Sequence, residues 1–159
     1  ANVARFVVAQ YLFQSELVPL YNDADLTAIV PDLPARCRAE AAMADLADLD
    51  TEVPGPVAGA LHLPSKAQAL GWLFVSEGSK LGAAFLIKRA VGLGLNETFG
   101  ARHLGEPAGG RAEGWKSFVK TLDGLQLSAQ EEAELDKGAI DAFNRFTLLL
   151  EQAYATATV

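Results

Sequence analysis

Residues 71–85 read GWLFVSEGSKLGAAF, and this stretch decides the fold because it predicts a helix with glycine in its interior. Gly71, Gly78 and Gly82 are spaced by seven and four residues, so they share one face of that helix. Each interior glycine costs about 0.8–1 kcal/mol relative to alanine. One reason for this stripe is close packing against another helix, because small residues let two backbones approach. The other is a flat ligand resting on the bare helix, flanked by an aromatic residue and by cations: Phe74, Lys80, Lys88 and Arg89.

Helix signals continue on both sides of this stretch. Apolar residues at helical spacing predict a helix from about Asn2 to Tyr21, and a proline in the first turn predicts another from Pro34 to Leu49. Two capping boxes, at residues 65–68 and 128–131, predict helices that run to about Val91 and Ala155.

The remaining segments complete a helical plan. Residues 111–122 are expected to form a helix, whereas residues 51–64 and 95–110 carry loop-forming prolines or glycines. Strand signals are absent from the sequence. The fold expected is one all-α domain, residues 1–159, of five or six helices. The last helix is expected to point these residues inward: Leu135, Phe143, Phe146, Leu149, Leu150 and Ala153.

Composition narrows the classes of function. A single cysteine, Cys37, excludes an internal disulfide and a cysteine zinc cluster, and it fits a reducing, cytoplasmic location. The net charge of −7 disfavours nucleic acid, because phosphate contacts need surplus lysine and arginine. No apolar run approaches the roughly 18 residues that span a bilayer, so no membrane partner is expected. The chain starts at Ala1 in the middle of a helical pattern, so we expect further residues upstream.

Five separated stretches carry a family resemblance that runs from about Asn2 to Tyr154. They are residues 4–14 (ARFVVAQYLFQ), 70–86 (LGWLFVSEGSKLGAAFL), 99–104 (FGARHL), 109–118 (GGRAEGWKSF) and 142–146 (AFNRF). Together and in this order they resemble the bacterial heme oxygenases, most closely the biliverdin-producing, iron-acquisition type of pseudomonads.

The resemblance implies a heme oxygenase-like helical bundle that holds heme, which is both cofactor and substrate, between a proximal and a distal helix. The implied reaction uses O2 and electrons from a ferredoxin- or flavoprotein-type donor, and it yields biliverdin, CO and ferrous iron for iron acquisition. Two other readings remain open. One is a non-catalytic heme- or tetrapyrrole-binding protein of the same fold. The other is a helical interaction protein whose glycines only pack helices.

The resemblance also implies site residues. Gly78 and Gly82 match positions that cover the distal heme face. Ser79 stands where more distant members carry an aspartate that organises water, so a carboxylate relay is not expected. The remaining matches are two aromatic residues that pack on heme and two arginines near the distal water network or the propionates: Phe74, Phe146, Arg38 and Arg89. At Arg89 the nearest relatives usually carry lysine.

The iron ligand implied by the resemblance is a proximal histidine on a helix upstream of Ala1. The chain has only two histidines, His62 and His103. We expect His62 to be an exposed loop residue and His103 to have a structural hydrogen-bonding role, so no metal ligand is expected within the chain. The 159 residues alone should then have at most weak oxygenase activity.

Other residues admit a plain structural reading. Glu77 is expected to form a structural salt bridge beside the glycine stripe, and Trp72 and Trp115 are expected in the core. Cys37, between two arginines, is either a thiol of lowered pKa or a simple helix residue.

Overall fold

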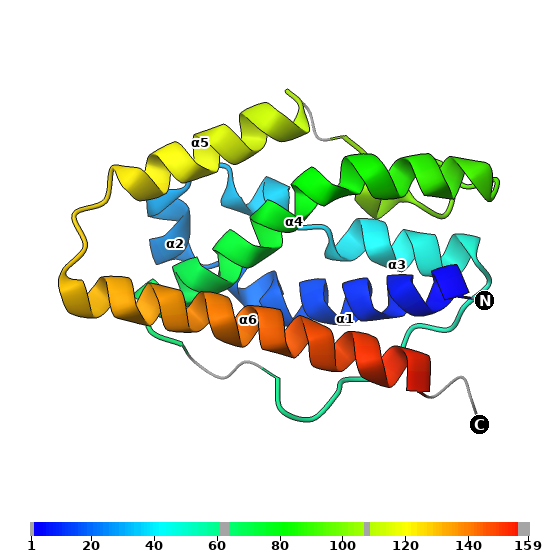
Figure 1. The fold of residues 1–159 in the computed structure, drawn as a ribbon, viewed down its shortest axis with the longest axis horizontal. Helices are drawn as coiled ribbons and strands as arrows, with labels where there is room; N and C mark the ends of the chain where they lie inside the picture. The colour runs from blue at the N-terminus through cyan, green and yellow to red at the C-terminus, as the bar shows by residue number, and fades with distance from the viewer. Residues whose placement is uncertain (1, 61–63, 107–108, 156–159) are drawn as a thin grey trace.

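The computed structural model describes residues 2–60, 64–106 and 109–155, and in that part of the chain it contains six α-helices (Figure 1). Their bounds are α1 Asn2–Tyr21, α2 Ala24–Ile29, α3 Ala39–Asp48, α4 Lys66–Gly92, α5 Arg111–Asp123 and α6 Ala129–Ala155. Two short 3-10 turns, η1 (Leu33–Arg36) and η2 (Arg102–Leu104), link them. The all-α prediction is confirmed, since the described residues contain no β-strand.

Both predicted capping boxes are present. Ser65 caps α4, with its hydroxyl accepting from the backbone N–H of Gln68 and the Gln68 side chain accepting from the backbone N–H of Ser65. Ser128 and Glu131 make the same reciprocal pair at the start of α6, at 3.0 and 3.1 Å. These local pairs satisfy backbone donors that a helix start leaves free, which is why both helix starts could be read from the sequence.

The segment between α1 and α3 differs from the prediction. The expected helix Pro34–Leu49 is split into η1 and α3, because Cys37 has extended backbone (φ −67°, ψ 137°). The short helix α2 was not predicted. Its N-cap is Asp23, whose carboxylate accepts from the backbone N–H of Leu26 at 2.9 Å, and that aspartate was the available signal.

One side chain of α6 was placed wrongly by the sequence analysis. Phe143 is 66% exposed, not inward. The buried positions of α6 are spaced by three or four residues, and they are Gly138, Ala142, Arg145 and Leu149. Phe143 follows Ala142 directly and is therefore turned about 100° away from that face. Leu135 and Phe146 are partly buried against the core, as expected.

The core lies where α1, α4 and α6 meet. Figure 1 shows α6 running along α1, with α4 rising across them and α5 on the other side of α4. Trp72 and Leu73 of α4 are buried against α1 and α6 residues such as Phe13 and Leu149, and Phe13 stacks on Trp72 at 6.2 Å. Trp72 is thus a core residue as expected, whereas Trp115 is only partly buried.

Two glycines set the distance between α4 and α6. A Cβ added to Gly71 would stand 2.1 Å from the carbonyl oxygen of Leu135, and one added to Gly138 would stand 2.1 Å from the carbonyl oxygen of Gln68. Backbone atoms fill both spaces and cannot turn aside as a side chain would. The helices therefore approach as closely as they do because neither position carries a side chain.

The apolar character of α4 is also notable. By length and composition α4 is the one helix of the described residues that is able to cross a membrane, and 39% of its most apolar window is buried in the protein. A core helix of a soluble protein passes the same test, so this is weak support for a membrane span. The length and apolar character of α4 are nevertheless closer to those of a membrane span than the sequence analysis expects.

We expect Gly71→Ala and Gly138→Ala each to lower the free energy of unfolding by about 1–3 kcal/mol, because the helices must separate to admit a methyl group. Gly82→Ala, in the same helix as Gly71, should instead raise it by up to about 1 kcal/mol, since alanine favours helix and nothing lies within 4 Å of the added Cβ. Urea unfolding followed by circular dichroism checks all three. Equal effects at Gly71 and Gly82 would contradict the conclusion that Gly71 sets the distance between α4 and α6.

Candidate functional site

The second half of α4 carries an uncovered apolar face, which we call the open face. Its members lie at helical spacing and are Phe74, Gly78, Leu81, Gly82, Phe85 and Arg89. Phe85 is 74% exposed, and Phe74 and Leu81 are 37% and 38% exposed. The opposite side of the same helix is buried, at Ser76, Ala83 and Ala90, and Glu77 is buried at the edge of the open face. Trp115 of α5 packs against Phe74 at 5.1 Å between ring centroids, and beyond it Leu81, Gly82 and Phe85 are exposed.

The three glycines of the stripe turn out to have different surroundings. Gly71 is closed by the backbone of α6, so the packing interpretation holds there. At Gly78 an added Cβ would make ordinary contact with the Trp115 ring at 3.4 Å. At Gly82 nothing lies within 4 Å of that point, and the residue is exposed. Packing therefore explains Gly71 but leaves Gly82 unexplained, and the ligand interpretation remains for that position.

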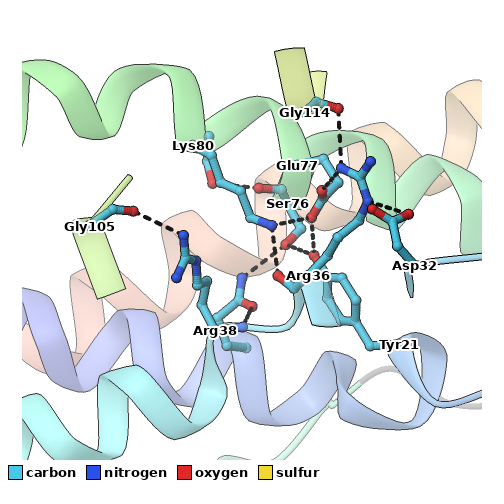
Figure 2. A network of polar contacts seen from close by, with 11 residues as sticks. Tyr21, Asp32, Arg36, Arg38, Ser76, Glu77, Lys80, Gly105 and Gly114 are labelled. Carbon is cyan, nitrogen blue, oxygen red and sulfur yellow. Dashed lines mark hydrogen bonds and ion pairs between the residues drawn. The ribbon is translucent and has the colours of Figure 1, made fainter. Parts of the chain in front are cut away.

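Behind the open face, a buried carboxylate ties α4 to the rest of the chain. The Glu77 side chain is 1% exposed, and its oxygens accept from Arg36 Nη1 at 2.8 Å and pair with Lys80 Nζ at 2.7 Å. Tyr21 Oη donates to Glu77 Oε2 at 2.7 Å. Figure 2 shows these side chains converging on Glu77 from α1, η1 and α4. The predicted salt bridge of Glu77 is present, and it is double.

The same network reaches Arg38 through side-chain amides and hydroxyls. Ser76 Oγ bonds to Tyr21 Oη at 2.7 Å and accepts from Gln14 Nε2 at 2.9 Å. Gln14 Oε1 in turn accepts the backbone N–H of Arg38 at 3.1 Å, and Arg38 Nη2 donates to the carbonyl of Gly105 at 2.9 Å. The break between η1 and α3 is thereby held against α1, which aims Arg38 toward α4.

Burial shifts three pKa values around this network. It raises the pKa of Tyr21 well above 10.0, and the Glu77 charge adds to that rise. Burial lowers the pKa of Lys80, which the Glu77 carboxylate opposes. It also raises the pKa of the Cys37 thiol. The hypothesis of an activated cysteine is therefore wrong, and Cys37 lies at the end of η1 rather than inside a helix.

A small polar pocket of about 30 Å³ lies between α1, α4 and η2, and it brings together two of the predicted site residues, Arg38 and Ser79. His103 also lines it. His103 Nδ1 bonds to the buried Asp45 carboxylate at 2.5 Å, which is the structural role expected for this histidine. Its Nε2 is buried with no hydrogen-bond partner among the described residues. Ser79 Oγ donates to the carbonyl of Ser76 at 2.6 Å, so its lone pairs are left to accept.

The other predicted site residues are distributed as follows. Phe74, Gly78, Gly82 and Arg89 share the open face, and Arg89 is exposed toward the C-terminal end of α4. Phe146 does not lie on α4 but packs edge-on against Phe13 at 5.4 Å. His62 lies outside the described residues.

Sequence reasoning did not single out Arg36, Tyr21 or Ser76. The available signal was the polar trio Ser76, Glu77 and Lys80, which shares one side of an otherwise apolar helix.

An all-α bundle with an apolar, glycine-bearing helix face left uncovered is the architecture of a helical ligand-binding protein. The heme oxygenase family model matches residues 7–152. The chain is 59% identical over 155 residues to heme oxygenase PigA of Pseudomonas aeruginosa, covering 97% of this chain and 78% of that protein.

A solved structure agrees with that match. The NO- and CO-bound heme oxygenase of Neisseria meningitidis superposes with a TM-score of 0.89 and 36% identity, covering 96% of this chain and 76% of that one. The chain therefore belongs to the heme oxygenase family, and it is a heme-degrading enzyme. The predicted family and fold are confirmed, and nothing favours the non-catalytic alternative.

We expect Tyr21→Phe to lower the free energy of unfolding by about 1–3 kcal/mol near neutral pH, because Glu77 and Ser76 lose a buried partner. The raised pKa means that the folded state holds the phenol proton more tightly. This contribution is complete below the unfolded pKa of about 10 and is lost as pH rises through the folded pKa.

The difference between wild type and Tyr21→Phe should therefore shrink by about 1 kcal/mol between pH 8 and pH 11. Urea unfolding at the two pH values measures it, and Lys80 is present in both proteins, so its own titration cancels to first order. A difference that stays constant across this range would contradict the conclusion that the folded state holds the Tyr21 phenol proton more tightly than the unfolded state.

Proposed function

We propose that heme, as substrate, lies on the open face of α4 with its ring over Gly82. The observation that carries this is the empty space at Gly82, where no atom lies within 4 Å of a Cβ position on an exposed apolar face. A side chain there would occupy the surface on which a planar ring would rest. Glycine costs helix stability at this position, and no packing partner among the described residues accounts for it.

The chemistry of the open face suits such a ligand. A porphyrin is flat and apolar over its ring, and it carries two carboxylates on one edge. Phe74, Leu81 and Phe85 offer exposed apolar contact, and burying them under the ring removes that surface from water. Arg89, on the same face and nearer the end of α4, supplies a guanidinium that can pair with a propionate carboxylate in a bidentate manner.

We propose that the reaction consumes O2 and electrons from a ferredoxin- or flavoprotein-type donor, releases biliverdin, CO and ferrous iron, and serves iron acquisition in the cytoplasm. When bound, heme supplies the iron and the oxidation chemistry. The family membership and the free Cys37, which fits a reducing compartment, support this assignment.

The chain's own residues set the surroundings of the reacting oxygen. Gly78 and Gly82 leave space above the ring and present no acid or base to it. The small polar pocket beside Ser79 offers hydrogen-bonding groups instead, from Arg38 and from the unpartnered Nε2 of His103. We propose that these groups hold water that delivers protons from the side, with Ser79 Oγ accepting because its own proton is given to the Ser76 carbonyl.

The iron ligand stays a prediction. His103 uses Nδ1 on Asp45 and belongs to the small polar pocket rather than to the open face. These contacts therefore give no support to His103 as the iron ligand.

Gly82→Leu tests the proposed heme position. The variant should fold at least as stably as wild type, because the added side chain meets nothing within 4 Å of its Cβ. Heme affinity should fall by more than about tenfold, since the side chain takes the place of the ring. Heme binding is measured by a heme titration followed at the Soret band. Turnover is measured by the appearance of biliverdin absorption after ascorbate is added in air.

The matched control is Gly55→Leu, at an exposed loop glycine with equally open space. It should bind heme as wild type does. Heme binding and turnover unchanged in Gly82→Leu would place the substrate elsewhere. Failure of the wild-type protein, expressed from its complete gene, to bind or degrade heme would overturn the proposed function itself.

Arg89→Gln should leave heme turnover largely intact but change the ratio of biliverdin isomers, because the ring loses one anchor that fixes its rotation on α4. Lys66→Gln is the control, since it removes the same charge from an exposed residue at the opposite end of α4. Chromatography of the products gives the ratio. Identical ratios in wild type and Arg89→Gln would remove Arg89 from the site.

A further inference from the structure

A second cavity, of about 310 Å³, lies on the buried side of α4, between η1 and the start of α5. Its charged lining consists of four basic and two acidic side chains: Arg36, Arg38, Lys80, Arg111, Asp32 and Glu77. The local balance is therefore four minus two, or +2, in a chain whose net charge is −7. A concentration of positive charge of this kind in an acidic protein attracts anions.

Both acidic groups are already neutralised by two of the basic groups. Arg36 pairs with Asp32 at 3.0 Å and with Glu77 at 2.8 Å, and Lys80 pairs with Glu77 at 2.7 Å. Figure 2 shows these pairs on one side of the network, with Arg38 apart from them. The two other basic residues of the cavity, Arg38 and Arg111, make no ion pair with the acidic residues that line it.

These two guanidinium groups are held in place by neighbouring peptide carbonyls. Arg38 Nη2 donates to Gly105 O at 2.9 Å, and Arg111 Nη2 donates to Leu104 O at 2.8 Å. Arg38 makes no ion pair with the described residues, and the carboxylate paired with Arg111 belongs to Glu106, at 4.0 Å. Arg111 Nε is buried and has no hydrogen-bond partner in the described part of the chain.

Two fixed, like-charged groups at one cavity repel each other unless an anion lies between them. Burial lowers the pKa of Arg38; the nearby Glu77 and Tyr21 oppose this lowering, and the charge of Arg111 adds to it. A guanidinium presents its N–H groups in a planar fork that matches carboxylate and phosphate oxygens. Because both forks are already anchored, binding would cost little side-chain entropy. The Trp115 ring adds a flat apolar wall to the same cavity.

We propose that this cavity binds a small oxyanion, of the carboxylate or phosphate class, between Arg38 and Arg111. The proposal goes beyond the heme reaction, although the cavity shares Arg38 and Lys80 with the small polar pocket. Its location does give it a connection to the open face, since Trp115 both lines the cavity and packs against Phe74 at 5.1 Å between ring centroids.

The test is a titration of the heme-free protein with inorganic phosphate, and separately with malonate, at constant ionic strength. The readout is the indole N–H signal of Trp115 in two-dimensional NMR. The Trp115 signal should move and saturate, whereas that of Trp72, buried in the core, should stay. Saturation with phosphate only, malonate only or both supports the site and identifies the anion class.

Arg111→Gln should weaken the anion by at least about tenfold, because it removes one charged, bidentate partner. Arg111→Lys keeps the charge but loses the planar fork, so it should weaken the anion by about threefold. The matched control is Lys116→Gln in the same helix, which removes one charge from a side chain that is 73% exposed and not part of the cavity. Its affinity should equal that of wild type.

Three results would overturn the proposal. The first is no saturable shift with either anion. The second is an equal shift with chloride alone, which is an ionic-strength effect. The third is unchanged affinity in Arg111→Gln with native circular dichroism. If Arg111→Gln does not fold, Arg111→Lys against Lys116→Gln decides, and equal loss in both variants contradicts a site at Arg111.

Discussion

The close approach of α4 and α6 at Gly71 and Gly138 is the constraint on which the rest of the structure depends. Backbone atoms of each helix fill the space where the other would carry a side chain. The first half of α4 is thereby fixed in the core, between α1 and α6. The second half continues past the crossing, and there one of its sides has no covering element among the described residues. The open face exists because one continuous helix is buried at one end and bare at the other.

The buried Glu77 cluster fixes the rotation of α4 about its own axis. Arg36 and Lys80 approach the carboxylate from η1 and from α4, and Tyr21 approaches it from α1. Taking these charges out of water is costly, so the cluster is not a source of large net stability. What it does is fix orientation: Gly82 lies about 140° around the helix from Glu77, so it faces outward when Glu77 faces inward. The exposure of Gly82, on which the functional argument rests, is therefore tied to the buried Glu77 cluster.

Helix positions could be predicted because their signals are local, as the capping boxes at Ser65 and Ser128 show. The roles of the glycines could not, because the neighbour that closes Gly71 is a distant backbone and the feature that marks Gly82 is an empty space. Phe143 was misplaced because hydrophobicity alone does not say which side of α6 meets the core. The family was predicted from five motifs and is confirmed, whereas the heme-contacting residues remain predictions.

The central claim is that heme rests on the open face of α4, and ring-current shifts test it most directly. Gallium protoporphyrin is diamagnetic, so methyl resonances near its ring shift strongly without paramagnetic broadening. The account predicts large shifts for Leu81 and Leu86, which are exposed on α4, and none for Leu73 and Leu149, which are buried in the core. Large shifts confined to methyl groups away from α4, with Leu81 and Leu86 unchanged, would contradict it.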